Sequence, residues 1–308
     1  MSGAGEAVPS VGKANRSSHD VRVESSAIAM TAKLAAAGRA RESERPDRLF
    51  DDPFAAELAG PDGFRWMGEW RLPGMSEENP TIGPRTRFFD DLVLQAVEEG
   101  IRQIVLVAAG MDTRAFRLPL PAEARVFELD QGSVLAEKQA TLDALQAMPL
   151  CNRVAVAVDL EAGRWPNVLR AAGFDTSIAA AFVVERLSWY LTEEENALLL
   201  GNLASLGAQG SRLGLDMLSR DYLDNPAVAP FFDLLETKGI AWKFGTNEPG
   251  SFLKAHGWSA EVEDFDAVGR RFGRWPPPGV SEEVAAQAAK ASRSFFIRAR
   301  RLPEPHPI

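Results

Sequence analysis

Short apolar runs recur through the middle of the chain and predict buried strands. Five such strands are expected, at 104–109, 125–129, 153–158, 178–184 and 211–217. The run IVLVAA at 104–109 is apolar at every position, which is typical of a strand covered on both faces. Helical stretches follow the second, third and fourth strands, at about 131–147, 163–172 and 193–207. This alternation predicts right-handed crossovers and a mostly parallel sheet.

The first hundred residues carry a different pattern, in which helical spacing is broken by proline-rich stretches. Residues 1–20 are small and polar and are expected to form a disordered tail. Helical spacing runs from 21 to about 40 and again over 85–99. Between them, Asp52-Pro53 is typical of a helix start. The stretch 60–84 holds several prolines and glycines and is expected to be a loop.

Beyond residue 218 the pattern is irregular and mainly helical, apart from expected strands at 258–265 and 294–300. The stretch 219–290 is rich in Trp, Phe, Pro and Arg, which suits a cap over the carboxyl edge of the sheet. We expect one structural domain with these parts: a tail (1–20), an N-terminal helical segment (21–100), a cofactor-binding core (101–218), a cap or substrate insertion (219–290), and a last strand with its tail (291–308).

Composition and charge narrow the function classes. The 308 residues carry a net charge of -9, which argues against nucleic acid as the main partner. One cysteine, Cys151, and three scattered histidines make a disulfide framework or a transition-metal site unexpected. The N-terminus lacks the apolar core of a signal peptide, and no apolar run is long enough to span a membrane. We therefore expect a cytoplasmic protein with no membrane partner.

Four successive expected strands end in a glycine turn or an acidic residue. Gly110 follows the first strand, Glu128 and Asp130 end the second, Asp159 follows the third, and Glu185 follows the fourth. A single carboxylate after a strand is often a helix cap or a solvated turn. Four in register at the carboxyl edge of a parallel sheet, where α/β proteins bind ligands, indicate a site instead.

The loop after the first strand narrows the ligand. It reads Ala108-Ala109-Gly110 with Asp112 nearby, so it lacks the Gly-x-Gly-x-x-Gly pattern that brings backbone against a pyrophosphate. Asp112 would also repel a phosphate. A nucleoside with a sulfonium and an amino-acid end fits these acidic loops better than a dinucleotide does. S-adenosylmethionine is therefore the expected cofactor, and an NAD-dependent dehydrogenase is disfavoured.

Three stretches resemble the leucine carboxyl methyltransferase-like family of S-adenosylmethionine-dependent methyltransferases: PRTRFFDDLVLQAVEEGIRQIVLVAAGMDTRAFRL, VFELDQGSVLAEKQATL and VVERLSWYLTEEENALLL. The resemblance covers about 25–300 and is greatest to the bacterial members, several of which act on secondary metabolites. It implies an α/β, class I methyltransferase Rossmann-like fold. Such a fold has a doubly wound sheet of seven strands with the last strand antiparallel, here with N-terminal helices and a mainly helical cap.

The resemblance also implies a set of cofactor-binding residues: Arg85, Ala108, Ala109, Gly110, Asp112, Glu128, Asp130, Gln131, Asp159, Leu160 and Glu185. By this match, Arg85 pairs with the methionine carboxylate, as a bidentate fork suits a carboxylate. Asp130 binds the ribose hydroxyls, with Glu128 as the less favoured candidate. Asp159 and Leu160 lie beside the adenine. Glu185 lies near the methionine ammonium.

Two departures from the family pattern concern the site. Ala108 stands where the family has glycine, which is tolerable if its backbone dihedrals are ordinary. After Glu185 the family commonly reads Gly-Leu-Leu-Met-Tyr-Leu, whereas this chain reads Arg-Leu-Ser-Trp-Tyr-Leu at 186–191. Arg186 and Trp189 either reshape the acceptor pocket or face outward from a helix start.

The expected reaction is O-methylation of a small-molecule carboxylic acid, and the favoured acceptor is an aromatic or polyketide-like metabolite. The cofactor leaves as S-adenosylhomocysteine. The acceptor attacks in line and without a metal, and a carboxylate acceptor needs no general base. The expected catalytic residues are Glu185, Arg186 and Tyr190. Arginines that could orient the acceptor are Arg87, Arg114, Arg186 and Arg220, although Arg114 equally suits an internal ion pair with Asp112 or Asp90. Two alternatives stay open: methylation of a protein C-terminus, and a cofactor-binding protein that does not methylate.

Overall fold

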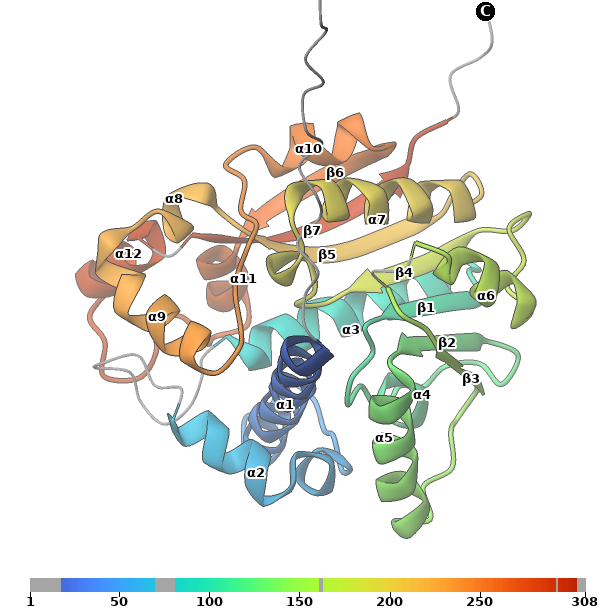
Figure 1. Ribbon diagram of the computed structural model, residues 1–308, viewed down its shortest axis with the longest axis horizontal. Helices are drawn as coiled ribbons and strands as arrows, with labels where there is room; N and C mark the ends of the chain where they lie inside the picture. The colour runs from blue at the N-terminus through green and yellow to red at the C-terminus, as the bar shows by residue number, and fades with distance from the viewer. Residues whose placement is uncertain (1–17, 70–80, 161–162, 292, 304–308) are drawn as a thin grey trace, which may run out of the picture.

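The computed structural model describes residues 18–69, 81–160, 163–291 and 293–303, and most of the expected tail lies outside these ranges. A seven-stranded sheet runs through them in the order β3-β2-β1-β4-β5-β7-β6 (Figure 1). The strands are β1 (Gln103–Val107), β2 (Arg125–Asp130), β3 (Asn152–Ala157), β4 (Ala180–Val184), β5 (Arg212–Leu218), β6 (Trp258–Asp264) and β7 (Ser294–Arg301). All seven expected strands are confirmed, with ends within two residues of the predicted ones.

The pairing gives the sheet its polarity. β1 pairs in parallel with β2 and β4, β2 with β3, and β4 with β5. β7 is antiparallel to both of its neighbours, β5 and β6. The last strand alone therefore runs against the others, and the predicted class I methyltransferase-like, doubly wound fold is confirmed.

Helices cover both faces of the sheet. They are α1 (Ser18–Ser43), α2 (Ala55–Glu69), α3 (Ile82–Glu98), α4 (Arg114–Arg117), α5 (Gly132–Ala144), α6 (Trp165–Ala171), α7 (Glu193–Leu206), α8 (Arg220–Leu223), α9 (Ala229–Thr237), α10 (Pro249–Ala255), α11 (Phe265–Arg271) and α12 (Glu282–Ala291), with 3-10 turns η1 (Ser188–Tyr190) and η2 (Pro226–Val228). Because side chains alternate along a strand, β1 sends Ile104 and Leu106 to one core and Val105 and Val107 to the other.

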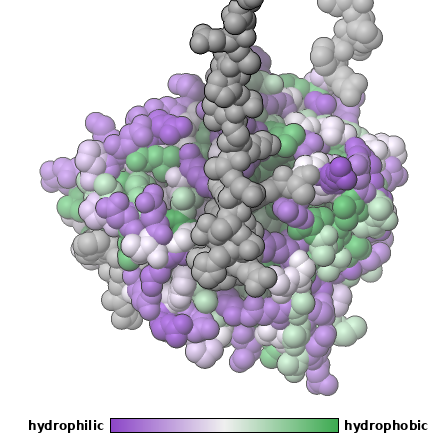
Figure 2. Space-filling view, in the orientation of Figure 1, coloured by the Kyte–Doolittle hydropathy of each residue, from purple (hydrophilic) through white to green (hydrophobic). Residues whose placement is uncertain are grey.

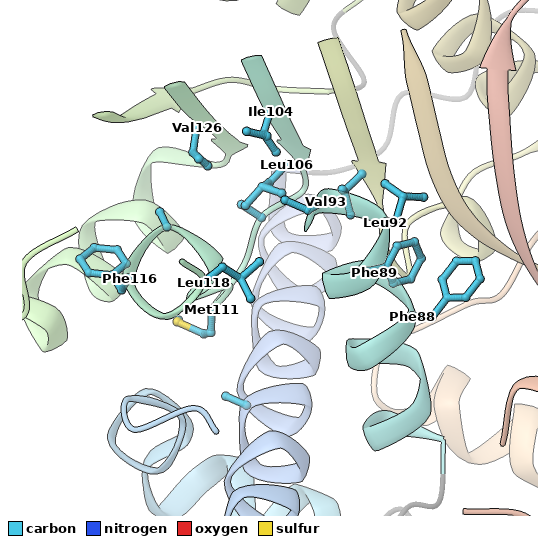
Figure 3. Close-up of a cluster of buried hydrophobic side chains, with 14 of the residues drawn as sticks. Phe88, Phe89, Leu92, Val93, Ile104, Leu106, Met111, Phe116, Leu118 and Val126 are labelled. Carbon is cyan, nitrogen blue, oxygen red and sulfur yellow. The ribbon is translucent and has the colours of Figure 1, made fainter. Parts of the chain in front are cut away.

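Each core has its own helices. In the first, Val93 of α3 lies beside Leu106 of β1, and Phe88 and Phe89 lie on the other side of α3 (Figure 3), where their rings contact Phe296 of β7. Residues of α1 and α2 join this core. In the second, α6, α7 and α10 pack on the opposite face. A strand apolar at every position is the sequence signature of this three-layer arrangement.

The N-terminal third differs from expectation in two places. Helix α1 begins at Ser18, inside the expected tail, and runs beside α2 (Figure 1). The predicted loop at 60–84 is wrong for 60–69, which are helical, and for 82–84, which open α3; residues 70–80 lie outside the described ranges. Pro61 does not end α2, because Gly60 takes a left-handed conformation (φ 57°) and Pro61 restarts the helix beyond a kink.

The range 219–290 is divided between two roles. α8, η2 and α9 lie over one end of the sheet, where α12 is also found (Figure 1). β6 lies in the same range but is a strand of the sheet itself, paired to β7. The division of the chain into a core and a cap stays a prediction.

Hydrophilic residues cover much of the face shown in Figure 2, with hydrophobic residues in patches between them. Within the described ranges, no helix is both long and apolar enough to cross a bilayer.

Candidate active site

A cavity of about 120 Å³ opens at the point where the strand order reverses, between the carboxyl ends of β1 and β4. This is the place at which doubly wound sheets bind ligands. Its walls include ten of the residues singled out from the sequence: Ala108, Ala109, Gly110, Asp112, Arg114, Asp130, Gln131, Glu185, Arg186 and Tyr190. Arg85, Glu128, Asp159 and Leu160 are not among its lining residues.

Glu128 lies inside the fold and not in the cavity. Its side chain is fully buried and pairs with Lys138 and Arg153, each at 2.8 Å. It stands level with Leu106 in the ladder, whereas Asp130 is the last residue of β2. A ribose role for Glu128 stays a prediction, and the buried pairing of its carboxylate with two cations disfavours it.

Asp159 and Leu160 also stand apart from the cavity walls. They follow β3, the edge strand, and Asp159 is exposed while Leu160 packs against the second core. The two residues that come next, 161 and 162, lie outside the described ranges. An adenine role for this pair stays a prediction.

The loop after β1 has a strained backbone at its first residue. Ala108 has φ 54° and Gly110 has φ 49°, so both occupy the left-handed region that favours glycine. The condition under which Ala108 was expected to be tolerable, ordinary dihedrals, is therefore not met. At Gly110 a side chain would also collide with α1, because an added Cβ would lie 2.9 Å from the Cβ of Ala32.

Replacing Ala108 with glycine is expected to stabilise the protein. A non-glycine residue in the left-handed region costs about 1–2 kcal/mol, of which the flexibility of glycine in the unfolded chain returns a part. We expect a gain of about 1 kcal/mol in the free energy of unfolding, measured by urea titration. Ala109→Gly is the matched control, because Ala109 has no positive φ, and it should lose about 1 kcal/mol. A less stable A108G variant would refute the strain at Ala108.

Asp130 holds this loop in place. Its Oδ2 accepts from the backbone N–H of Gly110 and its Oδ1 from that of Gln131, both at 2.7 Å. Burial raises the pKa of Asp130, although these two backbone donors partly oppose the shift. The carboxylate faces the cavity from the tip of β2, as the ribose-binding prediction requires.

Glu185 is clamped between two arginines. Its Oε1 accepts from Nε of Arg85 and its Oε2 from Nη2 of Arg114, each at 3.0 Å. Burial alone would raise the pKa of Glu185, but Arg114 and then Arg85 outweigh it and lower the pKa below its ordinary value. Glu185 is therefore a firmly ionised carboxylate.

Both internal ion pairs considered for Arg114 are present. Its Nε donates to Asp90 at 2.8 Å, and its Nη1 and backbone N–H donate to Asp112. Burial lowers the pKa of Arg114, but its three carboxylate partners raise it more. With every edge of its guanidinium engaged, Arg114 organises the loop and is poorly placed to take an acceptor.

The remaining arginine candidates differ in availability. Arg87 donates to Asp91 and to the carbonyl of Leu49, and Arg220 is exposed on α8. Arg186 lines the cavity, its guanidinium carbon lies 4.9 Å from the ring centre of Trp189, and its Nε has no partner within the described ranges. It is therefore the cation best placed to meet an acceptor.

A carboxylate that the sequence did not point to supports Arg186. Asp216 of β5 is 1% exposed, and its Oδ1 accepts from the backbone N–H of Arg186 at 2.7 Å. Arg186 itself has φ 55°, so this bond fixes a left-handed turn directly after Glu185. The sequence feature that could have pointed to Asp216 is its place as a charged residue in the otherwise mostly apolar strand RLGLDML.

Asp216 should make stability depend on pH. Burial raises its pKa to about 6. Between about pH 6 and pH 4 the folded state binds this proton before the unfolded state does, so the folding stability due to Asp216 increases as pH falls through that window. Asp216→Asn is neutral at every pH and should exceed the wild type by up to about 3 kcal/mol at pH 8, with the difference vanishing near pH 4. Urea titrations of both proteins across this range check the sign; a constant difference would contradict it.

Helix α1 supplies a wall of the site that the sequence did not reveal. Thr31, Ala35 and Arg39 line the cavity, and their spacing of four places them on one face of the helix. Arg39 donates to Asp52 at 2.8 Å and to the carbonyl of Met111 at 2.5 Å. The small residues Thr31 and Ala35, followed at the same spacing by Arg39, could have marked this face in the sequence. Nothing in the local sequence, however, indicates which part of the fold the face meets.

The donor set fits the expected cofactor at its amino-acid end. Arg85 is 2% exposed, and its Nη2 is buried without a partner in the described part of the chain. Because buried guanidinium groups are normally fully paired, this atom is suited to a carboxylate such as that of the methionine moiety. Asp112, Asp130 and Glu185 bring three carboxylates to the cavity, and Arg39, Arg114 and Arg186 line it with them.

Comparison with known proteins identifies the chain's family. Residues 32–204 match the model of the family described as leucine carboxyl methyltransferase. A Mycobacterium avium protein named as an S-adenosyl-L-methionine-dependent methyltransferase is 34% identical over 306 residues, covering 89% of this chain and 95% of the relative. A Parafrankia protein of the same name is 38% identical over 282 residues, covering 86% and 88%.

Solved structures agree in fold. A DUF574 family protein from Streptomyces avermitilis superimposes with a TM-score of 0.57 at 15% identity, covering 88% of this chain and 97% of the other. A Thermobifida fusca protein named as a methyltransferase gives 0.56 at 17% identity, covering 88% and 94%. With the family model, the relatives and the fold in agreement, the chain belongs to the leucine carboxyl methyltransferase family and is an S-adenosylmethionine-dependent methyltransferase.

Proposed function

We propose that the protein methylates the carboxylate of a small, flat and largely apolar acid. The observation that carries the proposal is the state of Glu185. A hydroxyl acceptor needs a base to take its proton. Glu185 lines the cavity beside Arg186, but Arg85 and Arg114 hold both of its oxygens and lower its pKa, so it is a poor base. A carboxylate acceptor is already ionised and needs none.

The roles of the other residues follow from their places. The bound cofactor supplies an electrophilic methyl group on a cationic sulfur. Arg186 holds the acceptor's carboxylate, and Tyr190 forms the wall beside it. Glu185 attracts the cofactor's ammonium and Arg85 its carboxylate. Holding two reactants in line and away from water supplies much of the rate in such a displacement.

The nucleoside end is assigned to the loops at the tips of β1 and β2. Asp130 receives the ribose hydroxyls while it keeps the loop closed through Gly110. Ala108 and Ala109 bring small side chains under the cofactor, and Asp112 and Gln131 complete the wall. Aromatic residues around the acceptor side favour a secondary metabolite over a protein C-terminus.

The proposal is tested by transfer of a tritiated methyl group from S-adenosylmethionine to a panel of aromatic carboxylic acids. Methyl esters are cleaved by alkali and release volatile methanol, whereas methyl ethers are stable. We expect alkali-labile product. Alkali-stable label would show that the acceptor is not the carboxylate, and cofactor binding without transfer to any acid in the panel would overturn the proposed acceptor class.

A further inference from the structure

An aromatic cluster adjoins the acceptor side of the cavity. It consists of Trp189, Tyr190, Tyr222, Phe231, Phe232 and Trp242 and is called here the Trp242 cluster. The ring of Trp242 lies 4.8 Å from that of Trp189 and 5.5 Å from that of Phe231. Backbone N–H of Lys243 donates to the carbonyl of Trp189 at 2.6 Å, which ties the segment after α9 to η1.

Three polar atoms of this cluster are buried with no hydrogen-bond partner among the described residues: Nε1 of Trp189, Oη of Tyr190 and Nε1 of Trp242. The indole of Trp258, fully buried elsewhere in the fold, shows the usual arrangement by donating to the carbonyl of Leu200 at 3.2 Å. More than nine in ten buried polar groups have a partner. Unpaired buried atoms also occur elsewhere in the fold, as at Trp275, but three gathered in one cluster beside the cavity favour a polar partner there.

The position of the cluster indicates which molecule supplies that partner. Tyr190 lines the cavity, whereas Trp189 and Trp242 are outside the lining. Trp242 packs against Trp189 and against the group of buried residues that contains Tyr190, so the cluster adjoins the site through Tyr190. Arg186 also lines it and stacks on Trp189, with its Nε unpaired in the described ranges. A cation is therefore available for a carboxylate at one end, and indole N–H groups for hydrogen-bond acceptors beyond it. Indoles only donate, so the groups they bind must be acceptors.

We propose that the Trp242 cluster and Arg186 together bind the methyl acceptor, and that this acceptor is a flat aromatic acid whose ring system carries hydrogen-bond-accepting oxygens. The inference rests on the proposed function, because it places the acid's carboxylate at Arg186. It goes further by assigning recognition of ring oxygens to Trp189 and Trp242. An aromatic acid without such oxygens leaves the indole N–H groups unpaired and binds more weakly.

The test compares two bicyclic acids of similar size, chromone-2-carboxylate and 2-naphthoate, of which only the first carries ring oxygens. Their binding to the full-length protein saturated with S-adenosylhomocysteine is measured by calorimetry. We expect chromone-2-carboxylate to bind about tenfold more tightly. Equal affinities, or no binding of either acid, would overturn the proposal.

The variant Trp242→Phe keeps an aromatic ring and removes the N–H. It should weaken chromone-2-carboxylate binding by about fivefold and leave 2-naphthoate nearly unchanged. Trp275→Phe is the matched control, because Trp275 also has an unpaired buried Nε1 but packs on Phe265, in the first core. It should preserve the preference. A preference that survives in W242F would contradict the assignment.

These binding measurements do not need methyl transfer, so the two proposals can fail separately. Oxygen-dependent binding together with alkali-stable methylation would overturn the carboxyl chemistry and keep the recognition of ring oxygens. Alkali-labile methylation of both acids with equal affinities would do the reverse.

Discussion

Replacing Arg85 with leucine is expected to weaken S-adenosylhomocysteine binding by about 100-fold, because the variant loses the buried cation that we assign to the cofactor's carboxylate. Arg85 lies in the first turn of α3, is 2% exposed and joins the site through Glu185, which lines the cavity. Its Nε donates to Glu185, and its Nη2 is buried without a partner in the described ranges, where we propose that it meets the cofactor's carboxylate. Removing one member of a buried, hydrogen-bonded charge pair costs several kcal/mol, and about 2.7 kcal/mol corresponds to this loss.

The choice of ligand separates this role from general damage to the site. 5′-Methylthioadenosine has the nucleoside and sulfur but no amino-acid end, so R85L should bind it within about threefold of the wild type. Arg87→Leu is the control variant, since Arg87 lies two residues along the same helix but bonds to Asp91 and the carbonyl of Leu49. Calorimetry with both ligands decides the matter: equal losses for both would mean that Arg85 supports the pocket without touching the amino-acid end.

The sheet could be predicted from the sequence because the burial of a strand is recorded in its own consecutive residues. Strands buried on both faces read as unbroken apolar runs, and β1 and β4 are fully buried at every residue. The mostly parallel direction of the strands followed from their alternation with helices, and the antiparallel last strand followed from the family resemblance. The same logic brought Gly110, Asp130 and Glu185 to one edge, since parallel strands end together.

Side-chain partners and backbone dihedrals could not be read in this way. Glu128 and Asp130 are both acids near the end of β2. They are told apart only by the buried ion pairs that Glu128 makes with Lys138 and Arg153. The left-handed backbone of Ala108 depends on the loop's closure by Asp130 and on α1 packing over Gly110. These are contacts between residues far apart in sequence, which periodicity does not record.

A chain of buried charges links the site to the N-terminal segment. Asp52 pairs with Arg39 and Arg117, and Arg117 and Arg114 both bind Asp90. Burial alone would raise the pKa of Asp52, but Arg39 and Arg117 lower it below its ordinary value. Because Arg114 continues to Glu185, the geometry of the site depends on carboxylates that never reach the cavity.

Asp90→Asn should therefore destabilise the protein by about 3–5 kcal/mol, the usual cost of leaving buried charges unpaired. Asp90 is 2% exposed and accepts from Nε of Arg114 and from both terminal nitrogens of Arg117, at 2.7–2.8 Å. An asparagine amide of the same shape would turn a donor toward one of these guanidinium groups. At roughly 2–4 °C per kcal/mol for a chain of this size, the Tm should fall by about 10 °C. The neighbouring Asp91→Asn is the control.

That control breaks an ion pair of the same length on the same helix, from Asp91 to Nε of Arg87 at 2.7 Å. Its two side chains are 33% and 41% exposed, so water replaces the lost partner and the cost should stay below about 1 kcal/mol. The contrast between adjacent aspartates isolates burial from charge. If urea titrations gave D90N and D91N the same small loss in the free energy of unfolding, the buried chain of charges would add nothing to stability. Its extension from α1 to Glu185 would then serve cofactor binding alone.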